Sequence, residues 1–194
     1  MRVSELVRVV KADWKANAAS KKGRVILPLF RISHECAVRS RSANPLWKLG
    51  WIYRIGYLLI VVWILGVELP DEVTAGEGLQ LYHGQALVVN KRVIMGKNCI
   101  LRHSTTIGNT ILSDGRAGPS PILGDAVELG AHVVIIGDIT IGDYAVVGAG
   151  SVVVKNIPPG AVVVGNPARI IRYRESHGKS QFVDGAEGVP KFSN

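Results

Sequence analysis

The feature that most constrains this sequence is a six-residue period that begins at Leu123. From there the chain reads LGDAVE, LGAHVV, IIGDIT, IGDYAV, VGAGSV and VVKNIP, and every hexamer begins with an aliphatic residue. The fifth position is always small or apolar, and glycine often follows the aliphatic residue, where a tight corner favours it. A period of six fits neither an α-helix nor a hairpin. It predicts short strands that turn regularly into a three-sided coil, with aliphatic side chains stacked inward.

The same phase extends backward, less perfectly, through Val89, Met95, Leu101 and Ile107. We expect the coil to occupy residues 70–172. It is broken by an eight-residue step around His83 and by the segment 109–121, NTILSDGRAGPSP, which has Gly, Pro, Ser and Asp where the repeat needs aliphatic residues. We expect the second break to leave the coil as a loop. Breaks in a regular solenoid are where functional residues tend to lie.

The first part of the chain differs in charge and in hydropathy. The net charge is +8, and residues 1–56 hold 12 Lys and Arg against 3 acidic residues. The stretch 46–69 is strongly apolar, but Arg54 interrupts it, and the uncharged run that follows is too short to span a bilayer comfortably. We expect a basic, largely helical segment over residues 1–69. Two interpretations of its apolar part stay open: a helix buried against the coil, or a segment resting on a membrane surface.

Several classes of protein are disfavoured. Cys36 and Cys99 cannot build a disulfide framework in a chain of 194 residues, and neither lies in a Cys-x-x-Cys pair. The N-terminus lacks the uninterrupted apolar stretch of a secretory signal, so we expect a cytoplasmic setting. The basic residues are not interleaved with aromatic ones, and no nucleic-acid partner is expected. Residues 173–194 are expected to form a flexible tail.

Five stretches of the sequence carry a resemblance to a known family. They are YHGQALVVNK (82–91), ILRHSTTIGN (100–109), PILGDAVELGAHVVIIGDITIG (121–142), VVGAGSVV (146–153) and GNPARII (165–171). Together they resemble the hexapeptide-repeat acyltransferases, in the serine acetyltransferase branch that includes colanic-acid-type exopolysaccharide O-acetyltransferases. The resemblance implies a mainly β fold, a left-handed parallel β-helix, which is an exception to the right-handed crossover rule. It also implies a homotrimer that binds acetyl-CoA between neighbouring subunits, and no metal is expected.

The resemblance further implies that His83 is the general base. The family's carboxylate partner lies fifteen residues earlier, which is Glu68 here, where serine acetyltransferases have Asp. A carboxylate on the second ring nitrogen fixes the tautomer of a histidine and stabilises its imidazolium. Because fifteen is close to one coil of eighteen residues, the two positions are expected to lie one above the other. Without the resemblance, a lone histidine on an apolar strand is more simply a structural residue.

The remaining site residues follow by position. The resemblance implies that the cofactor contacts Gly108, Asn109, Ala131, Ala149, Pro167 and Arg169. Small residues at Ala131 and Ala149 would let an extended pantetheine approach the backbone, although corner packing explains them equally well. Pro167 would shape a turn near the adenine, and Arg169 is a candidate to bind a phosphate.

Three further residues are candidates to contact the acceptor: Arg102, His103 and Arg116. His103 is expected to line the wall of the site or contact the acceptor, with a role as base the alternative. His132 is expected to face solvent or line the cofactor groove. Cys99 lies at an inward position of the repeat and is expected to be a core residue. His34 and His177 have no other chemically active residues around them.

These observations predict an acetyl-CoA-dependent O-acetyltransferase that modifies a sugar hydroxyl in exopolysaccharide or capsule biosynthesis, by direct attack in a ternary complex. Serine acetyltransferases hold the substrate carboxylate with an adjacent Arg-His pair, and Pro119 and Ser120 occupy those positions here. Neither offers a charged clamp. Serine O-acetylation in cysteine biosynthesis and a non-catalytic hexapeptide-repeat scaffold are the alternatives. The basic, apolar N-terminal segment suits work at the inner face of the cytoplasmic membrane.

Overall fold

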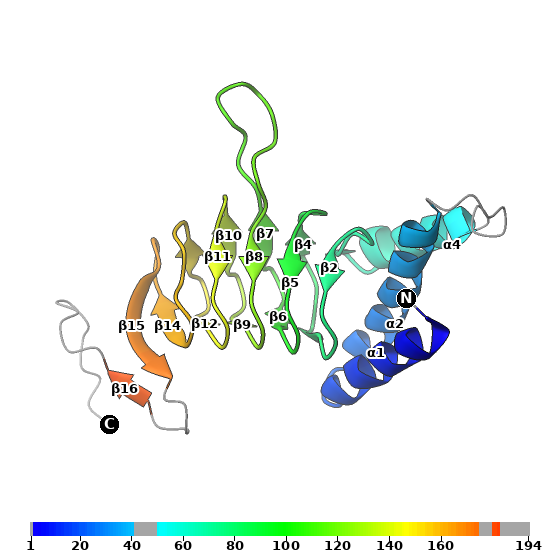
Figure 1. Ribbon diagram of the computed structural model, residues 1–194, viewed down its shortest axis with the longest axis horizontal. Helices are drawn as coiled ribbons and strands as arrows, with labels where there is room; N and C mark the ends of the chain where they lie inside the picture. Colours follow the sequence, from blue (N-terminus) through cyan, green and yellow to red (C-terminus); the bar gives the residue numbers. More distant parts are fainter. Residues whose placement is uncertain (1, 41–49, 175–179, 183–194) are drawn as a thin grey trace.

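The structure is a computed structural model that describes residues 2–40, 50–174 and 180–182. Helices α1 (Val3–Ala16) and α2 (Lys21–Arg39) come first, and α4 (Gly50–Tyr57) continues directly into the π-helical η1 (Leu58–Ile64). All four gather at one end of an elongated coil of strands (Figure 1). Within these described ranges, no helix has both the length and the hydropathy needed to cross a bilayer.

Short strands follow one another along the rest of the chain. Their bounds are β1 (Val67–Glu68), β2 (Thr74–Ala75), β3 (Gln80–Tyr82), β4 (Leu87–Val89), β5 (Ile94–Met95), β6 (Ile100–Arg102), β7 (Thr106–Gly108), β8 (Ile122–Leu123), β9 (Glu128–Leu129), β10 (Val134–Ile136), β11 (Thr140–Ile141), β12 (Val146–Val147), β13 (Val152–Val153), β14 (Ala161–Val164), β15 (Arg169–Arg174) and β16 (Ser180–Phe182).

The strands form three faces, and up to β13 each face takes every third strand. One face has the order β1-β4-β7-β10-β13, the second β11-β8-β5-β2, and the third β16-β15-β14-β12-β9-β6-β3. We call them the five-, four- and seven-stranded faces. Pairing is parallel until β14, after which β15 and β16 add antiparallel strands. The predicted left-handed parallel β-helix is confirmed, with about five turns.

The six-residue period marks the core of the coil. The aliphatic residues that open the hexamers are all at most 1% exposed: Leu123, Leu129, Ile135, Ile141, Val147 and Val153. Strand register stacks them, since Leu129 lies opposite Val147, and Val147 opposite Val163. Burying one such side chain stabilises the fold by roughly 1.5–3 kcal/mol.

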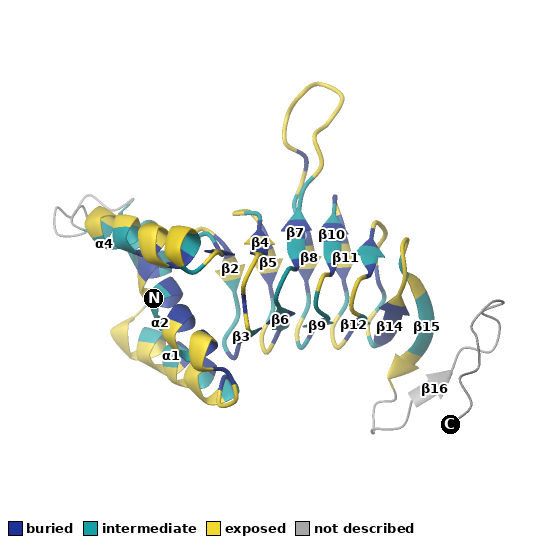
Figure 2. Ribbon diagram, turned by 180° about the vertical axis from the view of Figure 1, so that it is seen from behind, coloured by how far each residue is buried: buried dark blue, intermediate teal, exposed yellow. Residues whose placement is uncertain are grey.

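The coils are not equally long. In the first turn Glu68 lies opposite Val88 and Gln80 opposite Ile100, a spacing of 20 residues. Later in the coil Glu128 lies opposite Val146, a spacing of 18. Between β7 and β8 the segment 109–121 projects from the coil as a long exposed loop (Figures 1 and 2). The first coil begins at Val67, three residues before the boundary expected at residue 70.

Side chains from α1 and α2 cover the open end of the seven-stranded face. Among the described residues, β3 has no strand neighbour on its outer side. Side chains at the end of α1 bind its free backbone groups instead. The Asp13 carboxylate accepts hydrogen bonds from the amides of Gly78 and Leu79 at 2.8 and 3.0 Å. The Asn17 amide donates to the Leu79 carbonyl at 2.8 Å and accepts from the Leu81 amide at 2.9 Å. The helices therefore act as the polar cap that a solenoid end requires.

The charge of Asp13 is balanced inside this cap. Arg31 Nε donates to the Asp13 carboxylate at 2.8 Å, and both side chains are at most 5% exposed. The other guanidinium nitrogens donate to the carbonyls of Ala75 and Gly76, which belong to the first coil. A buried ion pair of this kind is stable because hydrogen bonds satisfy its remaining donors and acceptors.

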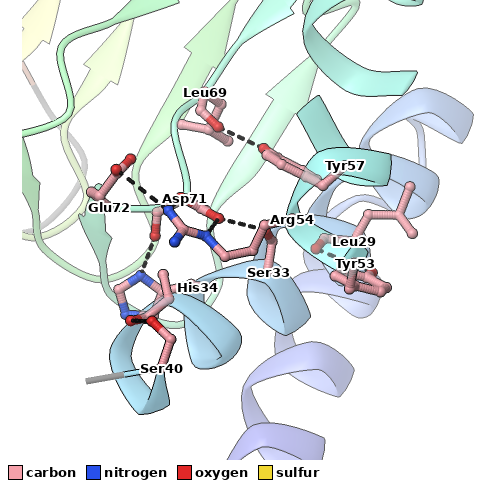
Figure 3. Close-up of polar contacts among 11 residues, drawn as sticks. Leu29, Ser33, His34, Ser40, Tyr53, Arg54, Tyr57, Leu69, Asp71 and Glu72 are labelled. Carbon is pink, nitrogen blue, oxygen red and sulfur yellow. Dashed lines mark hydrogen bonds and ion pairs between the residues drawn. The ribbon is translucent and has the colours of Figure 1, made fainter. Parts of the chain in front are cut away.

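A second cluster ties α2 and α4 to the first coil (Figure 3). The Asp71 carboxylate accepts hydrogen bonds from Ser33 Oγ and Arg54 Nε, each at 2.6 Å. His34 Nδ1 lies 2.8 Å from the Asp71 carbonyl, and since a carbonyl only accepts, this nitrogen carries the proton. Tyr57 donates to the Leu69 carbonyl at 2.6 Å. Burial alone would raise the pKa of Asp71, but hydrogen bonds from Arg54 and Ser33 outweigh it and lower that pKa.

Candidate active site

Three histidines stack along one edge of the coil, where the seven-stranded face meets the five-stranded face. His83 follows β3, His103 follows β6, and His132 lies between β9 and β10. The ring centroids of His83 and His103 are 5.7 Å apart, and those of His103 and His132 are 5.2 Å apart. The rings meet edge to face, at 78° and 83°. We call this the histidine edge.

The backbone conformation at this edge belongs to the corners of the coil. His83 and His132 have φ values of 65° and 59°, in the left-handed region. Histidine is one of the residue types enriched in that region. Ala126 and Tyr144 adopt the same conformation at other corners, with φ values of 53° and 59°. The left-handed conformation therefore reflects how the coil turns, and it is no special mark of catalysis.

The three histidines differ in exposure. His83 and His132 are exposed, whereas His103 is half-buried between them. The Nδ1 atom of His103 is buried and has no hydrogen-bond partner among the described residues. A buried polar atom without a partner costs roughly 1–3 kcal/mol. His103 therefore has a free hydrogen-bonding position next to His83.

His83 opens into a cavity of about 260 Å³ at the start of α2. The cavity is lined by Ala19, Ser20, Lys21, Lys22, Tyr82 and His83. Ser20 caps α2 by accepting from the Gly23 amide at 3.1 Å, and it donates to the Leu81 carbonyl at 2.6 Å. The helical cap thus holds β3 in place two residues before the imidazole. Sequence reasoning missed Lys21 and Lys22, which are visible in the sequence only as a basic pair.

Glu68 does not stack on His83. Because the first coil has 20 residues, Glu68 lies opposite Val88 on the five-stranded face, and the expectation of one position above the other was wrong. Glu68 is exposed and lines a different cavity, of about 460 Å³, between α4, η1 and the first coil. The structure gives no hydrogen bond between Glu68 and His83 within the described ranges. This larger cavity lies apart from the histidines, so its size does not mark it as the catalytic site.

The expected cofactor residues fall on two edges of the coil. Ala131 and Ala149 continue the histidine edge into later turns, and the Gly150 amide donates to the Ala131 carbonyl at 2.9 Å. Both alanines lie near or at the surface. Gly108 and Asn109 instead lie at the edge between the five- and four-stranded faces, where the loop leaves. We call this the loop edge.

Asn109 has a structural role that sequence analysis did not foresee. Its side chain accepts a hydrogen bond from Asn90 Nδ2 at 2.7 Å and donates to the Gly118 carbonyl at 3.3 Å. Ser120 Oγ donates to the Asn90 side chain at 3.1 Å. These contacts close the base of the loop.

Pro167 and Arg169 lie at the far end of the coil from the helices. The peptide bond between Asn166 and Pro167 is cis. Arg169 begins β15, its side chain is exposed, and its guanidinium donates to the Ala168 carbonyl at 3.2 Å. The guanidinium therefore keeps donors available at the surface.

Arg102 and Arg116 are both held in ion pairs. Arg102 pairs with Glu128 at 3.0 Å, donates to the Leu129 carbonyl at 3.1 Å, and covers the Tyr82 ring at 5.6 Å. Arg116 pairs with Asp114 in the exposed loop, where its hydrogen bonds lower the pKa of that carboxyl. Arg102 is next to His103 in the sequence, whereas Arg116 belongs to the loop that leaves from the other edge.

The remaining candidates from the sequence are structural or lie outside the described residues. Cys99 is buried, donates to the carbonyls of Gly124 and Gly96 at 3.2 and 3.6 Å, and burial raises its pKa to about 11. A thiol of this kind is a poor nucleophile. His177 lies outside the described residues. In the part of the chain that is described, no group of three or more His, Cys, Asp or Glu side chains is arranged to bind a metal ion.

Comparison with known proteins shows the family to which the chain is related. Residues 120–155 match the bacterial transferase hexapeptide family (six repeats). The chain is 38% identical over 160 residues to WcaB of Escherichia coli strain K12, named as a colanic acid biosynthesis acetyltransferase, across 81% of this chain and 96% of that protein. It is 33% identical to the serine acetyltransferase of Buchnera aphidicola, across 93% of this chain and 69% of that one.

Solved structures agree with this fold. The serine acetyltransferase of Neisseria gonorrhoeae superposes with a TM-score of 0.73 at 28% identity, covering 88% of this chain and 66% of that one. The soybean serine acetyltransferase apoenzyme gives a TM-score of 0.70 at 29% identity, covering 86% and 69%. With the repeat, the coil and these similarities in view, the chain belongs to the bacterial hexapeptide-repeat transferases, as an acyltransferase homologous to WcaB and to the serine acetyltransferases.

Proposed function

We propose that this protein is an acetyl-CoA-dependent O-acetyltransferase that modifies a sugar hydroxyl in exopolysaccharide or capsule biosynthesis. The observation that carries the proposal is the continuity of one edge of the coil. His83 and His103 lie at its helical end, and the small residues Ala131 and Ala149 follow in later turns. An extended pantetheine arm lying along this edge would bring its thioester toward the histidines.

The proposed reaction is a direct transfer in a ternary complex. His83 removes the proton from the acceptor hydroxyl as the oxygen attacks the thioester carbonyl. Backbone amides at the edge stabilise the oxyanion of the tetrahedral intermediate. The carbon–sulfur bond then breaks, and the CoA thiolate leaves and receives the proton from the imidazolium. His103, whose ring lies between those of His83 and His132, would contact the acceptor beside His83.

Glu68 remains the proposed positioning carboxylate for His83, on the strength of the resemblance alone. Its exposure leaves its side chain free to turn, and it lies on the face that begins at the corner after His83. Replacing it should cost less activity than replacing the base, because it orients the imidazole and transfers no proton.

The acceptor is proposed to be a saccharide for two reasons. Ser120, at one position of the charged clamp of serine acetyltransferases, donates its hydroxyl to Asn90, and the neighbouring Pro119 has no polar side chain. The WcaB relative is matched over nearly its whole length, whereas the Buchnera serine acetyltransferase is matched over 69%. Lys21 and Lys22 beside His83 would favour an acidic sugar or a sugar phosphate.

Serine O-acetylation is the second candidate, since serine acetyltransferases are among both the sequence relatives and the structural neighbours. One assay separates the functions. CoA release from acetyl-CoA is followed with L-serine, with neutral oligosaccharides and with acidic oligosaccharides. Preferred turnover of oligosaccharides is expected, and efficient turnover of serine would contradict it. An absence of CoA release with every acceptor would favour the non-catalytic scaffold.

We also propose that the active form is a homotrimer. The expected cofactor residues are divided between the histidine edge and the loop edge of the coil. A single groove containing both sets forms most simply when the histidine edge of one subunit lies against the loop edge of the next. The proposed location is the cytoplasm, at the inner face of the cytoplasmic membrane.

A further inference from the structure

We propose that α4 and η1 form a docking surface for a phospholipid bilayer that contains anionic headgroups. Eight large apolar side chains on these two helices are exposed, and we call them the α4–η1 face: Trp51, Ile52, Ile55, Leu58, Leu59, Ile60, Trp63 and Ile64. Trp63 and Ile64 are each 75% exposed. The two helices lie beside α2 at the helical end of the molecule, and η1 leads directly into the first coil (Figures 1 and 2).

The exposed side chains of η1 lie on one side of the helix. Successive residues of a π-helix are rotated by roughly 80°, so the exposed residues fall within about 160° of its circumference: Leu58, Leu59, Ile60, Trp63 and Ile64. Among the residues of α4 and η1, Tyr57 and Val61 are buried. A helix of this kind can insert its continuous apolar side into the surface of a bilayer while its opposite side stays packed on the protein.

Length and polarity place the helices in the plane of the interface. The two helices together span residues 50–64, at most about 22 Å, which is less than the ~30 Å hydrocarbon core. The sequence has no charged residue from Ile55 to Val67. Tryptophans at both ends of the face, Trp51 and Trp63, suit the level of the headgroups.

The helices are fixed to the coil on their other side. Arg54 binds the Asp71 carboxylate and Tyr57 binds the Leu69 carbonyl, so the polar groups of the helix face inward (Figure 3). Trp51, Ile55 and Leu58 also border the cavity between these helices and the first coil. The outward part of the face is therefore made by the other five exposed residues: Ile52, Leu59, Ile60, Trp63 and Ile64.

Charge specifies the kind of lipid. Residues 1–56 carry 12 basic residues against 3 acidic ones. The exposed Lys11, Lys15, Lys21 and Lys22 lie on α1 and α2, at the same end of the molecule as α4 and η1 (Figure 1). Each basic residue close to an anionic bilayer contributes about 1 kcal/mol of attraction, and salt screens this attraction.

The test is cosedimentation of the full-length protein with phosphatidylcholine vesicles that contain or lack phosphatidylglycerol. Wild type should bind the anionic vesicles, with an affinity that falls as salt rises. Ile64→Asp should lower that affinity by about tenfold or more. Ile111→Asp is the matched control, because Ile111 is 79% exposed but lies in the loop, outside the α4–η1 face. This variant should bind the vesicles as wild type does. Absence of wild-type binding, or equal binding of both variants, would overturn the proposal.

A second measurement starts from wild type and does not depend on the folding of Ile64→Asp. Phospholipids brominated in the acyl chains should quench the tryptophan fluorescence of wild type, and Trp63→Phe should lose a large part of that quenching. Unchanged quenching in Trp63→Phe would contradict insertion of this face. If Ile64→Asp instead dissociates the oligomer in sedimentation velocity and still binds vesicles, the face joins copies of the chain and the proposal fails. These assays contain no acetyl-CoA, so their outcome is independent of the proposed reaction.

Discussion

His83 and His103 lie one above the other in consecutive turns, with ring centroids 5.7 Å apart and ring planes at 78°. Their surroundings favour His83 as the general base and His103 as a contact for the acceptor. His83 is exposed and opens into a cavity that a substrate can enter, whereas His103 is flanked by His83 on one side and His132 on the other. An acceptor hydroxyl reaches His83 first, and His103 can contact the same acceptor from the side.

We therefore expect His83→Ala to lower kcat for acetyl transfer by about 10²–10⁴-fold, the usual contribution of a general base. The affinity for CoA should stay nearly unchanged, because the base acts on the acceptor. His132→Ala, one turn beyond His103 on the same edge, is the control and should lose far less. Steady-state kinetics with CoA-binding calorimetry provides both measurements. Wild-type turnover by His83→Ala together with loss in His103→Ala would reverse the assignment of the two histidines.

Glu68→Gln should lower kcat by about ten- to a thousandfold if the carboxylate turns to orient His83. Glu72→Gln is the matched control, because it is an exposed carboxylate on the same coil and borders the same cavity. Equal kinetics for both variants and wild type would show that the exposed Glu68 of this structure takes no part in positioning the base.

Asp13→Ala should lower the free energy of unfolding by about 3–5 kcal/mol. The change leaves Arg31 buried without its partner, and it removes the acceptor for the amides of Gly78 and Leu79. Denaturant unfolding measures the loss, with Lys11→Ala as the control because Lys11 lies on the same helix and is exposed. Similar stabilities for the two variants would show that the cap does not stabilise the end of the coil.

The lowered pKa of Asp71 predicts that the free energy of unfolding falls in acid. Its folded pKa is lowered below the ordinary value, so it stabilises the fold above the unfolded pKa, near 4, and this contribution is lost as pH falls through the folded pKa. Asp71→Asn should be less stable at neutral pH, and its unfolding free energy should fall less steeply below about pH 4. Urea unfolding between pH 3 and 6 tests this. Parallel curves for Asp71→Asn and wild type would rule out Asp71 as the group responsible.

Local patterns in the sequence predicted the regular part of the fold. The six-residue period identified the residues that stack in the core, and the composition of 109–121 marked the departure from the coil. Both signals are local, since each turn repeats the pattern of the one before. The histidine edge was harder to foresee, because the loop separates His103 from His132 in the sequence while the backbone places them in adjacent turns.

Contacts between distant segments could not be predicted. The first coil is two residues longer than the regular repeat, so Glu68 lies opposite Val88, whereas a repeat of 18 would have placed it opposite residue 86; neither register puts it above His83. The helical cap depends on Asp13 and Asn17 reaching backbone atoms more than sixty residues away. Asp13 and Asn17 bind backbone groups of the first coil that would otherwise pair with another strand, and no sequence period marks such a role. Only the structure shows why these polar residues are buried.

The division of the expected cofactor residues between two edges leads to a prediction about subunit complementation. His83→Ala disables the histidine edge. Gly108→Trp should block the loop edge; a Cβ added there meets only the flexible end of Ile136, at 3.1 Å, and circular dichroism of the variant checks that it folds. Each variant alone should be inactive. When equal amounts are unfolded and refolded together, random assembly of trimers should give intact sites at about one quarter of the interfaces.

Recovery of about a quarter of wild-type activity would therefore place the two edges of each site on different subunits. If both edges of a site came from one chain, every site in a mixed oligomer would contain one of the two changes, and no activity would return. Mixing His83→Ala with Ala149→Trp is the control, because both positions lie on the histidine edge and so on the same side of any interface. If His83 and Ala149 serve the same site, that mixture should stay inactive whether or not the two edges come from one chain. Recovery of activity in it would contradict the proposal that one line of residues along the histidine edge forms the site.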